Sequence, residues 1–95
     1  MSENFSKIIQ ELNNKNFNKA LELSEEYSTN TELHILNNLK GVIFINLKNH
    51  SKAIECFKNS LSYKENYVDA YLNLANVYFS NKKISQSIDT VRKAL

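Results

Sequence analysis

The 95-residue sequence contains no proline and a single glycine, Gly41. Both residue types mark turns and interrupt helices, so their scarcity favours a helical chain over a fold rich in β-hairpins. One glycine also excludes a glycine-rich loop that could hold a phosphate. The single cysteine, Cys56, excludes an internal disulfide and agrees with a reducing compartment.

Strong charge and long apolar runs are also absent from the sequence. The net charge is only +2, and the lysines are interleaved with acids, so no basic block indicates a nucleic-acid-binding surface. No run approaches the roughly 18 apolar residues of a membrane span, and the first ten residues lack the apolar core of a signal peptide. We expect a cytoplasmic protein with no nucleic-acid or membrane partner, unless a longer parent protein directs it elsewhere.

An internal repeat is the most informative feature of the sequence. When the chain is shifted by 34 residues, small residues align with small ones and large apolar residues with large apolar ones. The aligned pairs include Gly41 and Ala75, Phe44 and Tyr78, Ala53 and Ser87, Ile54 and Ile88, and Phe57 and Val91. A further copy lies upstream at a shift of 33, where Phe17, Ala20 and Leu21 align with His50, Ala53 and Ile54.

Each copy predicts two helices, because its apolar residues recur every three or four positions on both sides of a short polar break. The expected helices cover residues 3–13, 17–28, 32–47, 50–63, 67–80 and 84–95. Asn16, Thr31 and Asn49 precede helices, where their side chains can accept from free backbone N–H groups. Small residues such as Gly41 and Ala75 let the two helices of a hairpin approach closely. Stacked hairpins then bury the apolar faces that remain.

The third copy, from Ala70 to Tyr78 and on through Ser87, Val91 and Ala94, resembles the tetratricopeptide repeat (TPR) family. Tyr71 takes the family's Trp position, and Leu74, Ala75 and Tyr78 match its Leu, Gly and Tyr. The second copy matches through Gly41, Phe44, Ala53, Phe57 and Ser60, and it departs at Asn37 and Lys40. The resemblance implies an all-α, right-handed α-solenoid of about three TPR-like helix-turn-helix repeats (six helices). Residues 1–95 would form one domain, with repeats at about 1–33, 34–67 and 68–95.

The resemblance also implies function: a scaffold for protein–protein interaction, not an enzyme, which binds a peptide or protein segment in a concave groove lined by the first helices. The family's groove positions correspond to Asn38, Leu39, Val42, Ile45, Asn46, Asp69, Leu72, Asn73, Asn76 and Phe79. In the first repeat they correspond to Ser2, Phe5, Ser6, Ile9, Leu12 and Asn13.

The resemblance also implies two details of the groove. Asn73 stands where some peptide-binding members carry an asparagine ladder, because an amide both donates to and accepts from a peptide backbone. The competing interpretation is that Asn73 and Asn76 are solvated or bond neighbouring side chains. No groove position carries a lysine or arginine, and Asp69 would repel a carboxylate, so we expect no capture of a C-terminal carboxylate.

An apolar stripe on the last predicted helix, formed by Ile84, Ile88, Val91 and Leu95, gives two open interpretations. Either the sequence is a fragment of a longer protein and further repeats follow, or this face pairs with a second copy to form a homo-oligomer. The family resemblance implies an alternative function, because such repeats often precede glycosyl-, sulfo- or methyltransferase domains: the chain would be the substrate-binding or oligomerisation part of a larger transferase. A structural homodimer is a further alternative.

The reactive residue types do not form a recognisable catalytic or metal site. His50 stands where the other copies carry Phe17 and Ile84, which favours a packing role, and His34 has no second ligand at metal-like spacing. Cys56 has no histidine in an evident nucleophile–base arrangement, which favours a free structural thiol. We therefore expect no cofactor and no metal.

Overall fold

In the computed structural model, which describes residues 3–27 and 32–95, the chain is a row of six α-helices. The helices are α1 (Glu3–Asn13), α2 (Phe17–Glu26), α3 (Leu33–Asn46), α4 (His50–Tyr63), α5 (Val68–Ser80) and α6 (Ile84–Ala94). No β-strand occurs within these described ranges. The predicted helices agree to within one or two residues, and residue 28, the predicted end of the second helix, lies outside the described residues. The predicted all-α helical-repeat class is confirmed.

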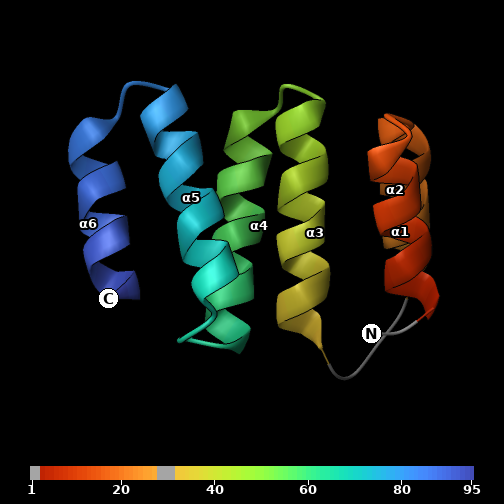
Figure 1. Cartoon of the computed structure of the whole chain (residues 1–95), viewed down its shortest axis with the longest axis horizontal. Helices are drawn as coiled ribbons and strands as arrows, with labels where there is room; N and C mark the ends of the chain where they lie inside the picture. Colours follow the sequence, from red (N-terminus) through yellow and green to blue (C-terminus); the bar gives the residue numbers. More distant parts are fainter. Residues whose placement is uncertain (1–2, 28–31) are drawn as a thin grey trace.

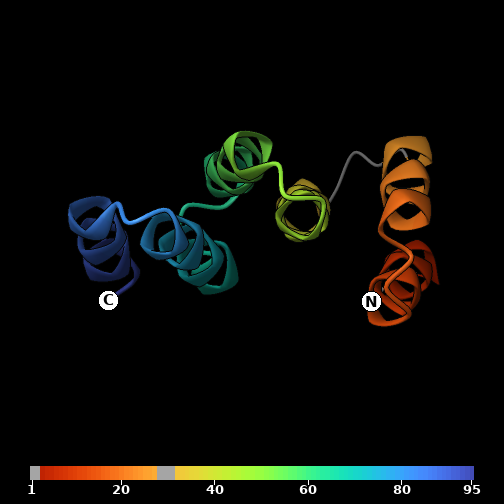
Figure 2. The same cartoon turned by 90° about the horizontal axis from the view of Figure 1, so that it is seen from above.

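Three helical hairpins follow one another along the molecule: α1–α2, α3–α4 and α5–α6 (Figure 1). The first hairpin and α6 lie at opposite ends of the row, and the molecule measures 36 × 26 × 17 Å. Seen from above, α1, α3 and α5 lie along one side, with α2 and α4 on the other (Figure 2). Each hairpin contacts its neighbour through the next first helix, because α3 packs on α1 and α2, and α5 packs on α3 and α4.

The turn inside each hairpin has the same backbone geometry. Lys15, Lys48 and Lys82 all adopt the left-handed conformation, with φ of 62°, 64° and 62°. The residue after each lysine donates its N–H to a carbonyl five residues earlier, as Asn49 does to Phe44 at 2.8 Å. These are Schellman turns, which satisfy the carbonyls that a helix end leaves free. The repeat of the sequence is thus also a repeat of backbone conformation.

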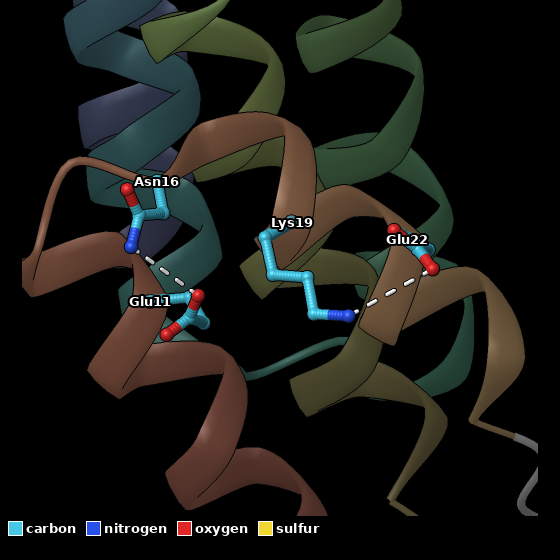
Figure 3. A network of polar contacts seen from close by, with 4 residues as sticks. All are labelled: Glu11, Asn16, Lys19 and Glu22. Carbon is cyan, nitrogen blue, oxygen red and sulfur yellow. Dashed lines mark hydrogen bonds and ion pairs between the residues drawn. The ribbon is translucent and has the colours of Figure 1, made fainter.

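One of the three predicted helix caps is confirmed. The side chain of Asn49 accepts from the backbone N–H of Lys52 at 3.2 Å. The prediction for Asn16 is wrong, because its side chain makes no cap bond to α2 and instead donates to a carboxylate oxygen of Glu11 at 3.4 Å (Figure 3). The bond to the charged carboxylate holds the Asn16 side chain in an orientation in which its oxygen accepts no cap bond from α2. Thr31 lies outside the described residues.

The core consists of two clusters, each between a hairpin and the next first helix. The first cluster joins the α1–α2 hairpin to α3 and contains Phe5, Ile8, Ala20, Leu36 and Ile43. The second joins the α3–α4 hairpin to α5 and contains Ala53, Phe57, Leu74, Val77 and Tyr78. Burial is therefore distributed between neighbouring units, as expected for a repeat protein.

Within the hairpins, small residues allow close contact as predicted. A Cβ atom added to Gly41 on α3 would lie 2.6 Å from Cζ of Phe57 on α4, so the aromatic ring fills the space that the glycine leaves. Small hydroxyl groups add cross-helix hydrogen bonds. Ser60 donates to the carbonyl oxygen of His34 at 2.6 Å, and Ser87 donates to that of Ala75 at 2.9 Å.

Candidate functional site

The ten predicted groove residues lie on the first helices α3 and α5. The α3 members Leu39, Val42 and Ile45 are half-buried. The exposed members are Asn46, Asp69, Leu72, Asn76 and Phe79. In α1, Ile9 and Leu12 are half-buried, Phe5 is fully buried, Ser6 and Asn13 are exposed, and Ser2 lies outside the described residues. The resulting face has partly covered aliphatic side chains along α3 and exposed amides on α3 and α5.

Asn38 and Asn73 connect the two helices directly. The Asn73 amide donates to the side-chain oxygen of Asn38 at 3.0 Å, and Asn38 is only 8% exposed. A buried amide is stable only when its polar atoms are bonded, so this bond fixes α5 on α3. For Asn73, the structure therefore shows a bond to a neighbouring side chain, which was the alternative to a free ladder position.

Tyr67, just before α5, completes this polar junction between α3 and α5. Its ring meets the His34 ring edge to face, with centroids 4.8 Å apart. Burial raises the pKa of the Tyr67 phenol above its usual value of 10.0 and the nearby charge of Asp69 raises it further, while a hydrogen bond with Asn38 lowers it. Sequence reasoning did not identify Tyr67. The available signal was Asn38, an amide at the repeat position where the next copy carries Leu72.

The chemistry of the α1–α3–α5 side suits contact with another polypeptide. Its half-buried aliphatic side chains can bury apolar side chains of a ligand, and each exposed amide offers both a donor and an acceptor. The Asn46 amide already donates to the carbonyl of Val42 at 2.9 Å, which orients it while its oxygen stays available. Among the ten predicted groove residues, Asp69 is the only charged one.

Two further hollows are each lined by three consecutive helices. One, of about 420 Å³, lies among α4, α5 and α6 and is lined by Lys58, Leu61, Tyr71, Leu74, Tyr78, Gln86, Asp89, Thr90 and Lys93. The other, of about 250 Å³, lies among α2, α3 and α4 and is lined by Leu21, Glu25, Asn37, Lys40, Phe44, Lys52, Glu55, Cys56 and Asn59. The 34-residue shift maps Phe44 onto Tyr78 and Cys56 onto Thr90, so the hollows are copies of one repeat feature. Their other side chains differ in charge and polarity, so they do not indicate one shared ligand.

The remaining reactive residues take structural positions. Cys56 is a free, buried thiol. His50 is half-buried, and its Nδ1 atom is buried without a hydrogen-bond partner, in keeping with the apolar residues at its position in the other copies. Within residues 3–27 and 32–95, no three His, Cys, Asp or Glu residues gather as a metal site would require. In the same residues, no helix has the length and apolar character needed to span a bilayer.

Alkaline pH is expected to destabilise the fold partly through Cys56. Burial raises the pKa of this thiol above its usual 9.0, with Lys40 lowering it, Glu55 raising it and Lys52 lowering it to smaller extents. The folded state holds the proton more tightly than the unfolded state, so this stabilisation is complete below pH 9.0 and is lost as the pH rises through the raised value. The test measures the free energy of unfolding in urea at about pH 7.5 and at about pH 10. Between these two pH values, the free energy of unfolding should fall less for Cys56→Ala than for the parent chain.

Tyr67 provides the comparison for this experiment, since its raised pKa contributes a loss of the same sign above 10.0. In Tyr67→Phe, the part of the fall in unfolding free energy that comes from the Cys56 thiol should therefore remain. An equal loss in Cys56→Ala and the parent chain would contradict the assignment.

Comparison with protein families agrees with this geometry. Residues 41–82 match the family model described as TPR repeat, and this span covers the end of α3, all of α4 and all of α5. A search of curated proteins found no match. TPR repeats generally mediate protein–protein interactions. The chain is therefore an all-α helical-repeat protein, and its residues 41–82 match the TPR repeat.

Proposed function

We propose that the chain binds a segment of another polypeptide along the side formed by α1, α3 and α5. The observation that carries this proposal is that α3 combines half-buried Leu39 and Val42 with the exposed amide of Asn46, and that α5, which packs on α3, exposes the amide of Asn76. The aliphatic side chains would cover apolar side chains of the ligand, at a gross gain of about 25 cal/mol per Å² buried. The amides would bond its backbone, which gives affinity with little sequence selection.

The charge of this side narrows the ligand. Asp69 is exposed at the start of α5, and the other nine predicted groove residues are uncharged. An acidic segment or a terminal carboxylate would meet repulsion without a compensating cation. The proposed ligand is therefore a neutral or basic segment with apolar side chains, held at an internal stretch and not by its carboxyl terminus.

A displayed library of random 12-residue peptides provides the test. Peptides selected on the parent chain should bind the double variant Asn46→Ala/Asn76→Ala at least tenfold more weakly, because each lost backbone hydrogen bond is worth about 1 kcal/mol. Affinity would be measured by fluorescence anisotropy.

Asn59→Ala is the matched control, since Asn59 is an exposed asparagine on α4, a helix of the other layer. It should leave the affinity unchanged. Peptides whose affinity is insensitive to the double variant, or equally sensitive to Asn59→Ala, would contradict binding along α3 and α5. Circular dichroism of the three proteins verifies that all remain folded.

A further inference from the structure

Half of the basic residues of the chain gather at one edge of the row, which we call the turn edge. The turn edge consists of residues 14–19, 47–52 and 81–86, the three hairpin turns with the first residues of α2, α4 and α6, and all three turns lie at the top in Figure 1. These ranges contain no Asp or Glu, and they contain six of the 12 Lys and Arg residues, all exposed: Lys15, Lys19, Lys48, Lys52, Lys82 and Lys83. The three groups lie 33 and 34 residues apart in the sequence, so the fold creates a basic edge from lysines that form no block in the sequence.

The opposite edge is acidic where the hairpins join. The ends of α2 and α4 and the starts of α3 and α5 lie there, at the bottom in Figure 1. In and beside these helix ends the sequence places five acids, with Lys64 as the one cation: Glu25, Glu26, Glu32, Glu65 and Asp69. The small net charge of +2 is therefore the sum of a basic edge and an acidic one. Such a separation of charge steers an anionic ligand toward the turn edge.

Four of the six lysines have no ion-pair partner among the described residues. The Lys19 ammonium lies 3.8 Å from a carboxylate oxygen of Glu22 (Figure 3), and the Lys52 ammonium lies over the Phe44 ring, 5.5 Å from its centroid. The other ion pairs of these residues lie outside the turn edge. The four remaining ammonium groups are available to an anion from outside the chain: Lys15, Lys48, Lys82 and Lys83.

The backbone of the turns provides a second, independent observation. Lys15, Lys48 and Lys82 have φ of 62°, 64° and 62°, the left-handed conformation that glycine and asparagine adopt at least cost. Asparagine is common here, since one stands directly beside each of these lysines, yet each copy has lysine at the left-handed position. Residues are held in costly conformations mostly where a site needs them. The three strained lysines therefore indicate a function for the charge at the turns.

We propose that the turn edge binds an acidic segment of a partner polypeptide, which lies in extended form across the three turns. The longest dimension of the molecule is 36 Å, and an extended chain advances about 3.3 Å per residue, so a segment of roughly ten residues suffices. Because alternate side chains of an extended chain point to the same side, Glu or Asp at every second position presents its carboxylates to the lysines. The proposal does not depend on a ligand along α1, α3 and α5, where Asp69 disfavours an acidic segment.

A segment that carries carboxylates fits this edge better than a nucleic acid or a membrane does. The turn edge has no arginine for bidentate bonds to phosphate, and its phenyl ring, Phe17, is half-buried and not free to stack on a base. Its one exposed apolar side chain, Ile84, does not form the apolar face that a membrane-surface segment inserts among lipids. Lysine ammonium groups, in contrast, act as flexible point charges that pair with single carboxylates.

The test titrates isotope-labelled protein with an unlabelled peptide of about 12 residues in which Glu and Ser alternate, and it follows the amide chemical shifts. At about 0.1 M salt the screening length is about 10 Å, so charges on the opposite edge contribute little. The shifts should map to the turn edge. The triple variant Lys15→Gln/Lys48→Gln/Lys82→Gln should bind the peptide about eightfold more weakly, at roughly twofold for each exposed lysine. Glycine at the same three positions, which the backbone favours, should weaken binding equally.

The matched control is Lys58→Gln/Lys64→Gln/Lys93→Gln, which removes the same number of charges from exposed lysines outside the turn edge. Its affinity for the peptide should stay within about twofold of that of the parent chain. Equal weakening by the two glutamine variants would reduce the effect to net charge and would overturn the proposal, as would peptide-induced shifts that map away from the turn edge.

Other occupants of the turn edge are separate arms of the experiment. A peptide with Gln in place of Glu should not bind. Tighter binding at the turn edge by an oligothymidylate with the same number of charges, or by phosphatidylserine vesicles, would assign the edge to a nucleic acid or a membrane and overturn the proposal. Sedimentation should show a monomer, and self-association that the turn-edge glutamine variant abolishes would overturn it in favour of a second copy. The anisotropy assay on Asn46→Ala/Asn76→Ala tests a different surface, so failure of either proposal leaves the other standing.

Discussion

Phe57→Ala is expected to lower the free energy of unfolding by about 3–5 kcal/mol, the range for removal of a fully buried aromatic side chain. Phe57 has no exposed surface and belongs to the cluster that joins the second hairpin to α5. Its loss would therefore leave a cavity in the middle of the row and loosen α5 with everything beyond it. Urea unfolding followed by circular dichroism measures the change.

Phe79→Ala is the matched control, because Phe79 is 61% exposed and its loss should change stability by no more than about 0.5 kcal/mol. Similar losses in the two variants would contradict the assignment of Phe57 to the core.

Gly41→Ala tests the same contact from the other helix. Alanine is the better helix former by about 1 kcal/mol, yet its methyl group would overlap the Phe57 ring. We expect a net loss of about 1–3 kcal/mol, as for other overpacked cores. The next repeat carries Ala75 and Val91 at the two equivalent positions. In a Phe57→Val background, Gly41→Ala should therefore be neutral or stabilising by up to about 1 kcal/mol. An unchanged penalty in that background would contradict the steric explanation.

The second large effect is a gain in stability when the lysine in each of the three hairpin turns is replaced by glycine. Lys15, Lys48 and Lys82 all have φ near +62°, a conformation that costs an L-residue roughly 1–2 kcal/mol and glycine nothing in steric terms. Part of the gain is offset because glycine loses more backbone entropy on folding. We expect roughly 0.5–1 kcal/mol from each Lys→Gly substitution and about 2 kcal/mol from the triple variant, as additivity holds for distant sites.

Lys58→Gly provides the control for this series, since Lys58 is an exposed lysine in the interior of α4. It should destabilise by about 1 kcal/mol, with the opposite sign. Thermal unfolding at matched protein concentration compares the four single variants and the triple. Destabilisation by the three turn substitutions would contradict the left-handed assignment.

The helices were predictable because their apolar residues keep a strict helical period and because a polar break of two to four residues separates them. Aligning the copies also identified Gly41 and Ala75 as close-contact positions, and the Phe57 ring against Gly41 bears this out. These features can be predicted from the sequence because they depend on residues that lie close together in the chain and recur at a fixed interval.

The turns and the junction were harder to predict, for physical reasons. The usual signal for a left-handed helix end is glycine or asparagine, whereas this chain uses lysine three times. Asn16 has the right residue type for a cap, but its amide nitrogen donates to a carboxylate on the preceding helix and its oxygen makes no cap bond. The bond between Asn38 and Asn73 joins residues 35 positions apart, so it depends on how the repeats stack. Which predicted groove residues remain exposed depends on the same stacking.

The division of the core into two separate clusters has a mechanical consequence. Because the two clusters have no buried residue in common, tension applied between the chain ends would be resisted by one interface at a time. We expect such a molecule to lengthen in steps under load, shedding a terminal hairpin while the other two keep their shape. Under load, the hairpins would therefore separate one after another, and the row would not resist tension as one rigid unit.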